Sequence, residues 1–434
     1  MKTSAKWVMV LLLAAAVSGM TSRNSAAEWP HWRGATRNGV VDESSGWDGE
    51  NWLLSDVWNA NVGEGSTAPL IVDDRLYTMG WQDGRDRVQC LDALTGRMLW
   101  SVDYVAPRFG REAVGDQGIY SGPSSTPEFD DETGYLFTLS LDGDLHCWNT
   151  RDKGKTIWGN NLYEQFDVPR RPQVGRSGRR DYGFTSSPLV WRDWLIVEVG
   201  AKEGNLVAFD KRTGKKVWTS QSQAPAGHNG GPVPMTVEGV PCVAVHNHDG
   251  LLVVRLDAEH HGETIATWDW MTTFANNIAT PTVDGNYILL TSSYNIHKIA
   301  KLEITLGGAR LVWEQKQASK VCSPVIYDGH VYWAWRQVMC LDYETGALRW
   351  QGGRVGDQGS LIATKDGRLI VWANRGDLTL IESAKRSPKN YTELAAKKRI
   401  GKTDAWPHVV LSGGLLFCKD RAGRLVCLKL QASD

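Results

Sequence analysis

Short runs of alternating apolar and polar residues, separated by turns of two or three residues, recur along most of the chain. The clearest run is Ser323–Trp350, SPVIYDGHVYWAWRQVMCLDYETGALRW. Its pattern predicts four short strands, at 324–327, 330–335, 338–342 and a last one ending at 350. Asp328-Gly329, between the first two, is a strong two-residue hairpin signal. A single meander of this size cannot bury both of its faces, so it needs copies of itself to pack against.

Such copies are present elsewhere in the chain. Arg87–Trp100 (RVQCLDALTGRMLW) follows the end of the first run almost residue for residue, and Asn205–Trp218 and Asp144–Trp158 follow it closely. Looser versions end at Trp268 and Trp313. Small polar residues and usually a proline precede each copy, as in Ser186-Ser187-Pro188. A period of roughly 40 to 60 residues with four strands in each unit is the signature of a β-propeller.

The repeated turn D-x-x-T-G has a clear physical role. Its Asp carboxylate can accept bonds from the turn N–H groups, and its Gly adopts the left-handed conformation that closes the turn. The Trp four residues after the Gly falls on the outer strand, where its ring can contact the next blade. A lectin-like surface of tryptophans is disfavoured, because seven of the 21 recur at one repeat position. We therefore assign a structural role to Asp92, Gly96, Trp100, Trp158, Asp210, Gly214, Trp218, Trp268, Trp313, Asp342, Gly346 and Trp350.

The number of units predicts an all-β fold, an eight-bladed β-propeller of four-stranded antiparallel blades. The last unit supplies only three strands, so we expect Leu53–Asn59, with Trp58 near its end, to join it and close the ring. Seven blades is the alternative, because the seventh unit is irregular. In that unit a long basic turn follows Leu378–Glu382, and only a short final strand is expected, near Arg399-Ile400. Inner strands are expected to begin near Ala68, Thr126, Ser187, Pro232, Thr280, Ser323, Ser360 and His408.

Residues 1–27 have the features of a signal peptide, which bears on where the protein is located. Lys2 and Lys6 precede an apolar run, Val8–Val17, and Ser25-Ala26-Ala27 offers small residues for cleavage. The run is short for a membrane span, although a retained N-terminal anchor is the alternative. No cysteine precedes Cys90, so we expect no lipid attachment. We expect residues 28–434 to form one soluble, monomeric propeller domain, exported to the periplasm or outside the cell.

Charge and cysteine content narrow the partners and the chemistry. Without residues 1–27 the net charge is about −4, which gives no reason to expect nucleic acid or an anionic membrane as a partner. Cys90, Cys147, Cys340 and Cys427 share one repeat position, so we expect them to be buried small hydrophobes too far apart to pair. The sequence does not decide whether one disulfide forms among the seven cysteines.

The repeats resemble those of the pyrroloquinoline quinone (PQQ)-type β-propeller superfamily, as does Trp29-Pro30-His31-Trp32-Arg33-Gly34 followed by Asn38-Gly39. That superfamily includes the quinoprotein alcohol dehydrogenases, the propeller subunit of the outer-membrane barrel-assembly machinery and many exported proteins named only for the repeat. The resemblance covers essentially the whole chain after residue 27. It is specific for the fold and unspecific for the function.

A dehydrogenase is one function that the resemblance implies, with a quinone over the central channel, Ca²⁺ and an Asp base. This sequence lacks the adjacent Cys-Cys pair common in those enzymes, and it is shorter. It also has Asn229 where an Asp would be expected. We therefore expect no catalytic residue, cofactor or metal, and PQQ and calcium enter only under this alternative. His246-Asn247-His248-Asp249 could ligate a metal, but a polar hairpin tip is the favoured interpretation.

Binding is the favoured function, because the loops leading into the inner strands gather at the channel mouth. Two of them are long, Asp103–Pro123 and Gly159–Thr185, and both contain arginines and aromatic residues of the kind that interfaces and carboxylate sites prefer. Solvated loops are the alternative. We expect a non-catalytic scaffold for protein interaction or envelope assembly with a protein partner in the cell envelope; a glycan-binding propeller is a further alternative. The candidate binding surface is Arg108, Arg111, Tyr120, Arg170, Arg171, Arg179, Arg180, Tyr182, His228, Asn229, Asn276 and Asn277.

Overall fold

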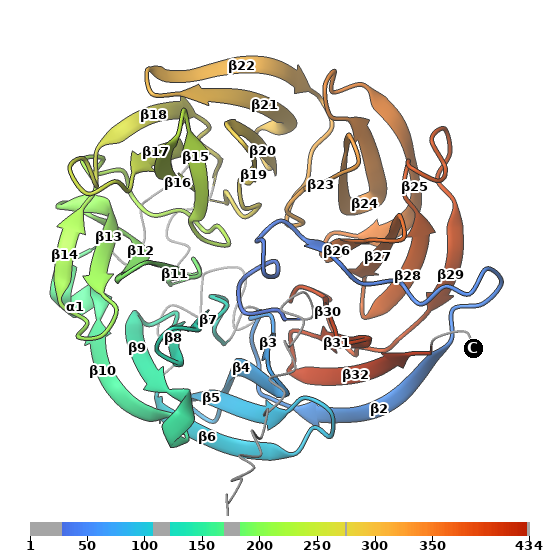
Figure 1. Cartoon of the computed structure of the whole chain (residues 1–434), viewed down its shortest axis with the longest axis horizontal. Coiled ribbons are helices and arrows are strands. Elements are labelled where there is room, and N and C mark those ends of the chain that lie inside the picture. The colour runs from blue at the N-terminus through green and yellow to red at the C-terminus, as the bar shows by residue number, and fades with distance from the viewer. Residues whose placement is uncertain (1–27, 107–121, 169–182, 274–275, 432–434) are drawn as a thin grey trace, which may run out of the picture.

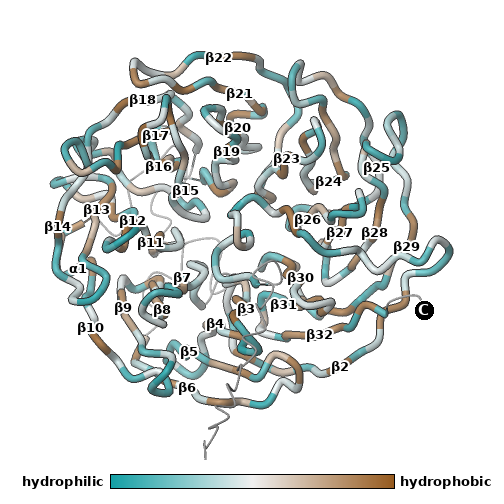
Figure 2. The backbone as a smooth tube through the Cα atoms, in the orientation of Figure 1, coloured by the Kyte–Doolittle hydropathy of each residue, from teal (hydrophilic) through white to brown (hydrophobic). Residues whose placement is uncertain are grey.

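Eight sheets are arranged around one axis in the computed structural model of the chain, which describes residues 28–106, 122–168, 183–273 and 276–431. The first strand of each repeat lies nearest the axis and the last lies at the rim (Figure 1). Apolar stretches lie along the strands, whereas many turns between them are hydrophilic (Figure 2). The predicted eight-bladed propeller of antiparallel sheets is confirmed, and the seven-bladed alternative is wrong.

The first four blades follow the chain in order and contain four strands each. A short 3-10 helix (Thr150–Asp152) and helix α1 (Leu162–Phe166) lie around the outer strand of blade 2. The strands are β3 (Leu70–Val72), β4 (Arg75–Gln82), β5 (Arg85–Asp92) and β6 (Met98–Val105) in blade 1; β7 (Glu128–Asp130), β8 (Tyr135–Leu139), β9 (Asp144–Asn149) and β10 (Lys155–Asn161) in blade 2; β11 (Leu189–Trp191), β12 (Trp194–Ala201), β13 (Gly204–Asp210) and β14 (Lys216–Thr219) in blade 3; and β15 (Val233–Val237), β16 (Val240–His246), β17 (Gly250–Arg255) and β18 (Thr264–Asp269) in blade 4.

The last four blades complete the ring, and the first strand of blade 7 also pairs in parallel with β1 (Val40–Val41). Their strands are β19 (Thr282–Asp284), β20 (Tyr287–Ser293), β21 (His297–Thr305) and β22 (Gly308–Gln315) in blade 5; β23 (Val325–Tyr327), β24 (His330–Asp342) and β25 (Leu348–Gly356) in blade 6; β26 (Gly359–Thr364), β27 (Arg368–Ala373), β28 (Asp377–Glu382) and β29 (Glu393–Lys397) in blade 7; and β30 (Val410–Ser412), β31 (Leu415–Lys419), β32 (Arg424–Leu430) and β2 (Leu54–Asn61) in blade 8.

Blade 8 is closed by the N-terminal strand, as predicted. Strand β2 pairs antiparallel with β32, and Trp58 lies opposite Cys427. The same pairing recurs in blade 1, where Cys90 lies opposite Trp100. The repeat position that carries cysteine is therefore the position that faces the outer tryptophan. All seven cysteines are buried and free, so the disulfide left open by the sequence does not form.

Outer tryptophans pack against the turn glycines of the next blade. A Cβ added at Gly96 would lie 2.6 Å from the ring of Trp58, and one at Gly214 would lie 2.6 Å from the ring of Trp158. The Trp158 indole also donates a hydrogen bond to the Lys211 carbonyl at 3.0 Å. The repeated Gly thus serves two purposes: it adopts a positive φ, and it leaves room for the neighbouring ring.

Blade 6 differs from the four separate strands expected there. Its second and third strands run together as β24, with Arg336 in the left-handed conformation (φ 59). The side chains of Tyr332 and Cys340 interact, which a straight strand would not allow because eight residues span about 27 Å. The chain therefore reverses at Arg336 without a Gly, Asn or Asp to mark the turn.

Blade 7 is regular, and the expectation of a final strand near Arg399-Ile400 is wrong. Its outer strand is β29, inside the stretch interpreted as a long basic turn. That stretch also covers blade 6: the Ser387 carbonyl accepts a bond from the Trp350 indole at 3.1 Å. The Tyr391 ring lies where a Cβ at Gly352 would be, at 2.3 Å. No helix among the described residues is long and apolar enough to span a bilayer.

Candidate functional site at the channel mouth

The segment from residue 28 to β1 crosses the axis of the ring (Figure 1). Trp29 pairs with Ile71 of blade 1, with N···O distances of 2.8 and 3.0 Å. The Trp32 indole donates to Thr280 Oγ1 of blade 5 at 3.1 Å. The segment then leaves the axis along the inner strand of blade 7. The sequence of this segment contributed only to the family resemblance. Its position inside the ring was not predicted.

One buried carboxylate holds the segment in place electrostatically. Glu128 of blade 2 forms an ion pair with Arg37 and lies 3.1 Å from His31 Nδ1. Burial alone would raise the pKa of Glu128, but the charges of Arg37 and His31 outweigh it and lower this pKa to about 2. Glu128 therefore stays ionised at neutral pH and ties the N-terminal segment to blade 2.

Arg33 of this segment is fully buried and has no carboxylate partner among the described residues. Its guanidinium donates to Thr282 Oγ1 at 3.3 Å, to the Asn38 carbonyl at 3.0 Å and to the Pro324 carbonyl. Burial lowers the pKa of Arg33 to about 10, so the group stays protonated at neutral pH. A positive charge therefore lies inside the ring with neutral acceptors around it.

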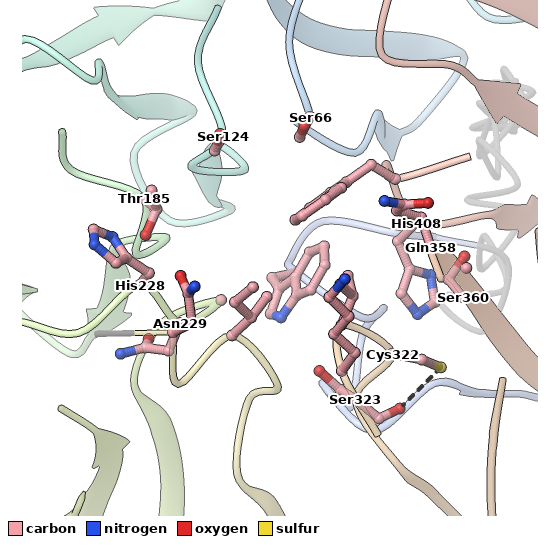
Figure 3. Close-up of a pocket in the computed structure, with 18 of the residues that line it drawn as sticks. Ser66, Ser124, Thr185, His228, Asn229, Cys322, Ser323, Gln358, Ser360 and His408 are labelled. Carbon is pink, nitrogen blue, oxygen red and sulfur yellow. Dashed lines mark hydrogen bonds between the residues drawn. The ribbon is translucent and has the colours of Figure 1, made fainter. Parts of the chain in front are cut away.

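A pocket of about 320 Å³ opens above this segment. The pocket is lined by one residue from each of several repeats, which stands three positions before the proline that starts the repeat. Figure 3 shows several of these residues converging on the cavity. Trp32 and His408 also line the pocket, and the two rings meet edge to face with centroids 5.4 Å apart. The lining residues at the repeat position are Ser66, Ser124, Thr185, Asn229, Ile278, Val321 and, in the proline-free blade 7, Gln358.

The small polar residues before the prolines connect neighbouring blades just below this ring of lining residues. Thr126 Oγ1 accepts from the Ala68 N–H at 3.0 Å, and Ser187 Oγ accepts from the Thr126 N–H at 2.9 Å. Ser323 Oγ accepts from the Thr280 N–H at 3.0 Å. Hydroxyls at this position satisfy inner-strand N–H groups of the adjacent blade, which gives the repeated Ser/Thr a structural explanation.

The structure brings some predicted site residues together and leaves others apart. His228, Asn229 and Asn276 line the pocket. Asn277 is buried beside it and donates to the carbonyls of Asn247 and His248. Trp32 and Lys320 line the pocket but were not predicted as site residues. Other lining residues could have been found from their position three residues before each proline. The other candidates lie outside the described residues: Arg108, Arg111, Tyr120, Arg170, Arg171, Arg179, Arg180 and Tyr182.

The lining is polar and carries little charge. Among the described residues it contains hydroxyls, side-chain amides and aromatic rings but no Asp, Glu or Arg, and Lys320 is its single lysine. Lys320 Nζ lies 2.7 Å from Asp357, which is outside the pocket. Burial lowers the pKa of His408 to about 4, so this wall residue is neutral at neutral pH.

The walls do not fit the calcium ion of a quinoprotein centre. A buried carboxylate next to the lining residue Asn229 is that of Glu198, which accepts from the Gly227 N–H at 3.0 Å, from Asn229 Nδ2 at 2.8 Å and from Ser186 Oγ. Burial raises its pKa to about 7. Calcium takes roughly six to eight oxygen ligands, carboxylates among them. Within the described part of the chain, no three His, Cys, Asp or Glu residues are grouped as metal ligands, and His246 and His248 belong to no such group.

The model of the family described as outer membrane protein assembly factor BamB matches residues 84–352. The chain belongs to this family. Among solved structures, BamB from Moraxella catarrhalis is similar with a TM-score of 0.59 and 13% identity, over 87% of this chain and 100% of that one. The quinohemoprotein alcohol dehydrogenase from Comamonas testosteroni has a TM-score of 0.65 and 12% identity, over 95% of this chain and 82% of that one. At these identities the similarity shows the fold.

Curated relatives of this BamB-family chain are dehydrogenase subunits. The alcohol dehydrogenase (quinone) subunit of Gluconobacter oxydans is 28% identical over 165 residues, 37% of this chain and 19% of that protein. The subunit of Komagataeibacter europaeus is 27% identical over 172 residues, 38% of this chain and 20% of that protein. The matches thus span about a fifth of the length of these relatives.

Proposed function

We propose that this BamB-family propeller is a non-catalytic binding protein of the cell envelope, which holds a segment of a partner protein at its channel mouth during assembly. The observation that carries the proposal is the pocket above Trp32, which is open to the mouth and has no Asp or Glu among its described lining residues. A surface that offers hydroxyls, amides and aromatic rings matches the groups of a polypeptide. The described family supports an assembly role by analogy.

The dehydrogenase alternative has the curated relatives in its favour, but the pocket argues against it. A calcium–quinone centre needs carboxylate ligands and a base near the reacting group. The carboxylate of Glu198 already accepts bonds from protein donors, and Asn229 turns its amide N–H toward that carboxylate. We therefore derive no catalytic step through the quinone or the metal.

Site-specific photocrosslinking in cells tests the proposal. A photoreactive amino acid replaces Ser124 or Asn276 at the mouth, and Ser101 on the exposed face of the outer strand β6 serves as the control. The expected result is a discrete protein adduct from positions 124 and 276 and none from 101. Equal adducts from all three positions would overturn the proposal. So would turnover of alcohols by the purified protein in a dye-linked assay with added PQQ and Ca²⁺.

A further inference from the structure

The pocket at the channel mouth is a dead end. Trp32 lines it, with its indole bonded to Thr280 at 3.1 Å and its ring against His408. The next residue, Arg33, is fully buried, and the segment that carries both residues crosses the axis of the ring (Figure 1). A polypeptide cannot pass through the ring here, so only a chain end or a projecting side chain can fill the depth of the pocket. Figure 3 shows the cavity surrounded by residues from several blades.

The charges around this dead end are positive. Lys320 lines the pocket, and Arg33 donates to the carbonyl of Pro324, next to the lining residues Cys322 and Ser323. Among the described residues, Arg33 has no carboxylate partner and the lining has no Asp or Glu. An anionic group is therefore favoured in the pocket, because Lys320 lines it and the buried Arg33 adds a positive charge next to the lining residue Trp32. An ammonium group would find no Asp or Glu among the described lining residues.

A second hollow, of about 360 Å³, adjoins the first on the rim between blades 5 and 6. The two hollows share Tyr294 and Lys320, so Lys320 lies at their junction. Trp335 lines the outer hollow, and the Arg336 guanidinium lies 4.6 Å from the centre of its ring. Together the hollows form an elongated path that runs from the outer hollow, which Trp335 and Asp357 line, past Lys320 into the inner pocket.

We propose that the channel mouth binds the C-terminal end of a polypeptide, with the terminal carboxylate accepting from Lys320 in the inner pocket and the preceding residues over Tyr294 and Trp335. This inference rests on the proposed function and specifies its partner. The side-chain amides of Asn229 and Asn276 both donate and accept, which matches the peptide groups of an extended chain. A neutral sugar would match the hydroxyls but would offer Lys320 no charged group in exchange for Asp357.

Asp357 already forms an ion pair with Lys320, so the ligand carboxylate must compete with Asp357 for the ammonium group. Their ion pair measures 2.7 Å, and Lys320 lowers the pKa of Asp357. The Asp357 side chain is 46% exposed, so it can turn toward solvent when a ligand arrives. A carboxylate in the inner pocket would attract Lys320 more strongly than the exposed Asp357 does, and this gain has to exceed the cost of desolvating the ligand carboxylate. Binding should therefore depend on Lys320 and be restrained by Asp357.

Fluorescence anisotropy with defined peptides tests this assignment. The probe is a hexapeptide of neutral residues with fluorescein on its N-terminus and a free C-terminal carboxylate. The same peptide with a C-terminal amide should bind about tenfold more weakly, because one charge-assisted hydrogen bond is lost. A version with a free N-terminal amine and the dye at its C-terminus should bind no better than the amide.

Matched variants separate the role of Lys320 from a general effect of charge. Lys320→Met should weaken the carboxylate peptide about tenfold and leave the amide peptide unchanged. Lys298→Met is the control, since Lys298 is similarly exposed (33% against 28%) and similarly paired, at 2.6 Å to Glu314. Asp357→Asn should tighten the carboxylate peptide, because it frees Lys320.

Equal affinity for the carboxylate and amide peptides would overturn the assignment, as would equal effects of Lys320→Met and Lys298→Met. Binding of maltohexaose at the mouth in preference to both peptides would overturn it in favour of a glycan. These failures are distinct from failure of the proposed function. A mouth-specific crosslink at position 124 with no carboxylate preference would keep the binding role and reject the chain-end ligand.

Discussion

The indole nitrogen of Trp32 donates a hydrogen bond to Thr280 Oγ1 at 3.1 Å, although the two residues are 248 positions apart in the chain. Thr280 belongs to the loop that enters the inner strand of blade 5, and its own N–H bonds to Ser323 of blade 6. The N-terminal segment is therefore tied to the same Ser/Thr positions that join neighbouring blades. The Trp32 side of the pocket and the closure of the ring share one set of contacts.

Replacing Thr280 by Val should loosen the Trp32 side of the pocket. The half-buried indole N–H of Trp32 would lose its acceptor, which costs about 1 kcal/mol, the net contribution of a typical hydrogen bond. We expect the free energy of unfolding, measured with urea, to fall by that amount. Thr267→Val, at an exposed position of the outer strand β18, should have little effect. Similar losses in both variants would show that the Trp32 contact has no special role.

The ion pair of Glu128 predicts a pH-dependent loss of stability on the acidic side. Its pKa is lowered from 4.5 to about 2 in the folded protein, so its contribution is present above pH 4.5 and is lost as the pH falls toward 2. Glu128→Gln leaves the half-buried Arg37 beside a neutral amide, which should cost about 3 kcal/mol at pH 7. The difference between wild type and variant should shrink below pH 4.5.

Unfolding by urea at pH 7, 5 and 3 measures this dependence. Glu259→Gln, on the exposed outer turn of blade 4, is the control and should match the wild type throughout. A Glu128→Gln deficit that is the same at all three pH values would contradict the ion-pair explanation. It would point instead to packing around the side chain.

Much of the fold could be predicted because each blade repeats the same local solution. Cys90 and Trp100 recur as cross-strand partners, and the turn glycine recurs under the next ring, so the blades can be counted from the sequence. The errors lie where a marker is missing. Arg336 reverses the chain although it is not a typical turn residue, and β29 carries no Trp, so its position was misassigned.

The candidate site was less predictable, because contacts between distant parts of the chain define it. Nothing local in Trp32 or Arg33 indicates that they lie on the axis, since their partners are Thr280, Thr282 and Pro324. The lining position, three residues before each proline, could have been identified from the sequence. The repeated residues identify the blades, whereas the residue that varies from blade to blade, such as Asn229 or Gln358, shapes the pocket.

Gly214 should be far less tolerant of alanine than another glycine of the same conformation. Its φ is +70°, and a Cβ would lie 2.6 Å from the Trp158 ring. Gly239 has φ +84° with nothing within 4 Å of an added Cβ. Gly239→Ala should therefore cost about 1–2 kcal/mol for the backbone alone, whereas Gly214→Ala should cost about 1–3 kcal/mol more for the displaced ring. Equal losses in urea unfolding would contradict the ring contact.

Lys419 joins the last blade to the first. Because its pKa is lowered in the folded protein, we expect the free energy of unfolding to rise above neutral pH. Its Nζ donates to Thr67 Oγ1 at 2.7 Å and to the Met79 carbonyl at 2.8 Å, both in blade 1. Burial lowers its pKa from 10.5 to about 7. Between these values the unfolded chain binds more protons than the folded protein, so stability should rise by about 1.4 kcal/mol per pH unit above pH 7.

Lys419→Met should remove this rise while keeping the ring closed. The Met79 carbonyl also accepts from Thr67 Oγ1, at 2.8 Å, and this bond does not involve Lys419. The substitution therefore leaves the Met79 carbonyl with a donor. We expect the substitution to destabilise the protein less at pH 6 than at pH 9, because at pH 6 the wild type bears the cost of a buried ammonium group. The exposed Lys215→Met should not alter the slope. A Lys419→Met deficit independent of pH would mean that the ammonium is stabilised in the closed ring, and that blade 1 accepts a charged lysine at no cost.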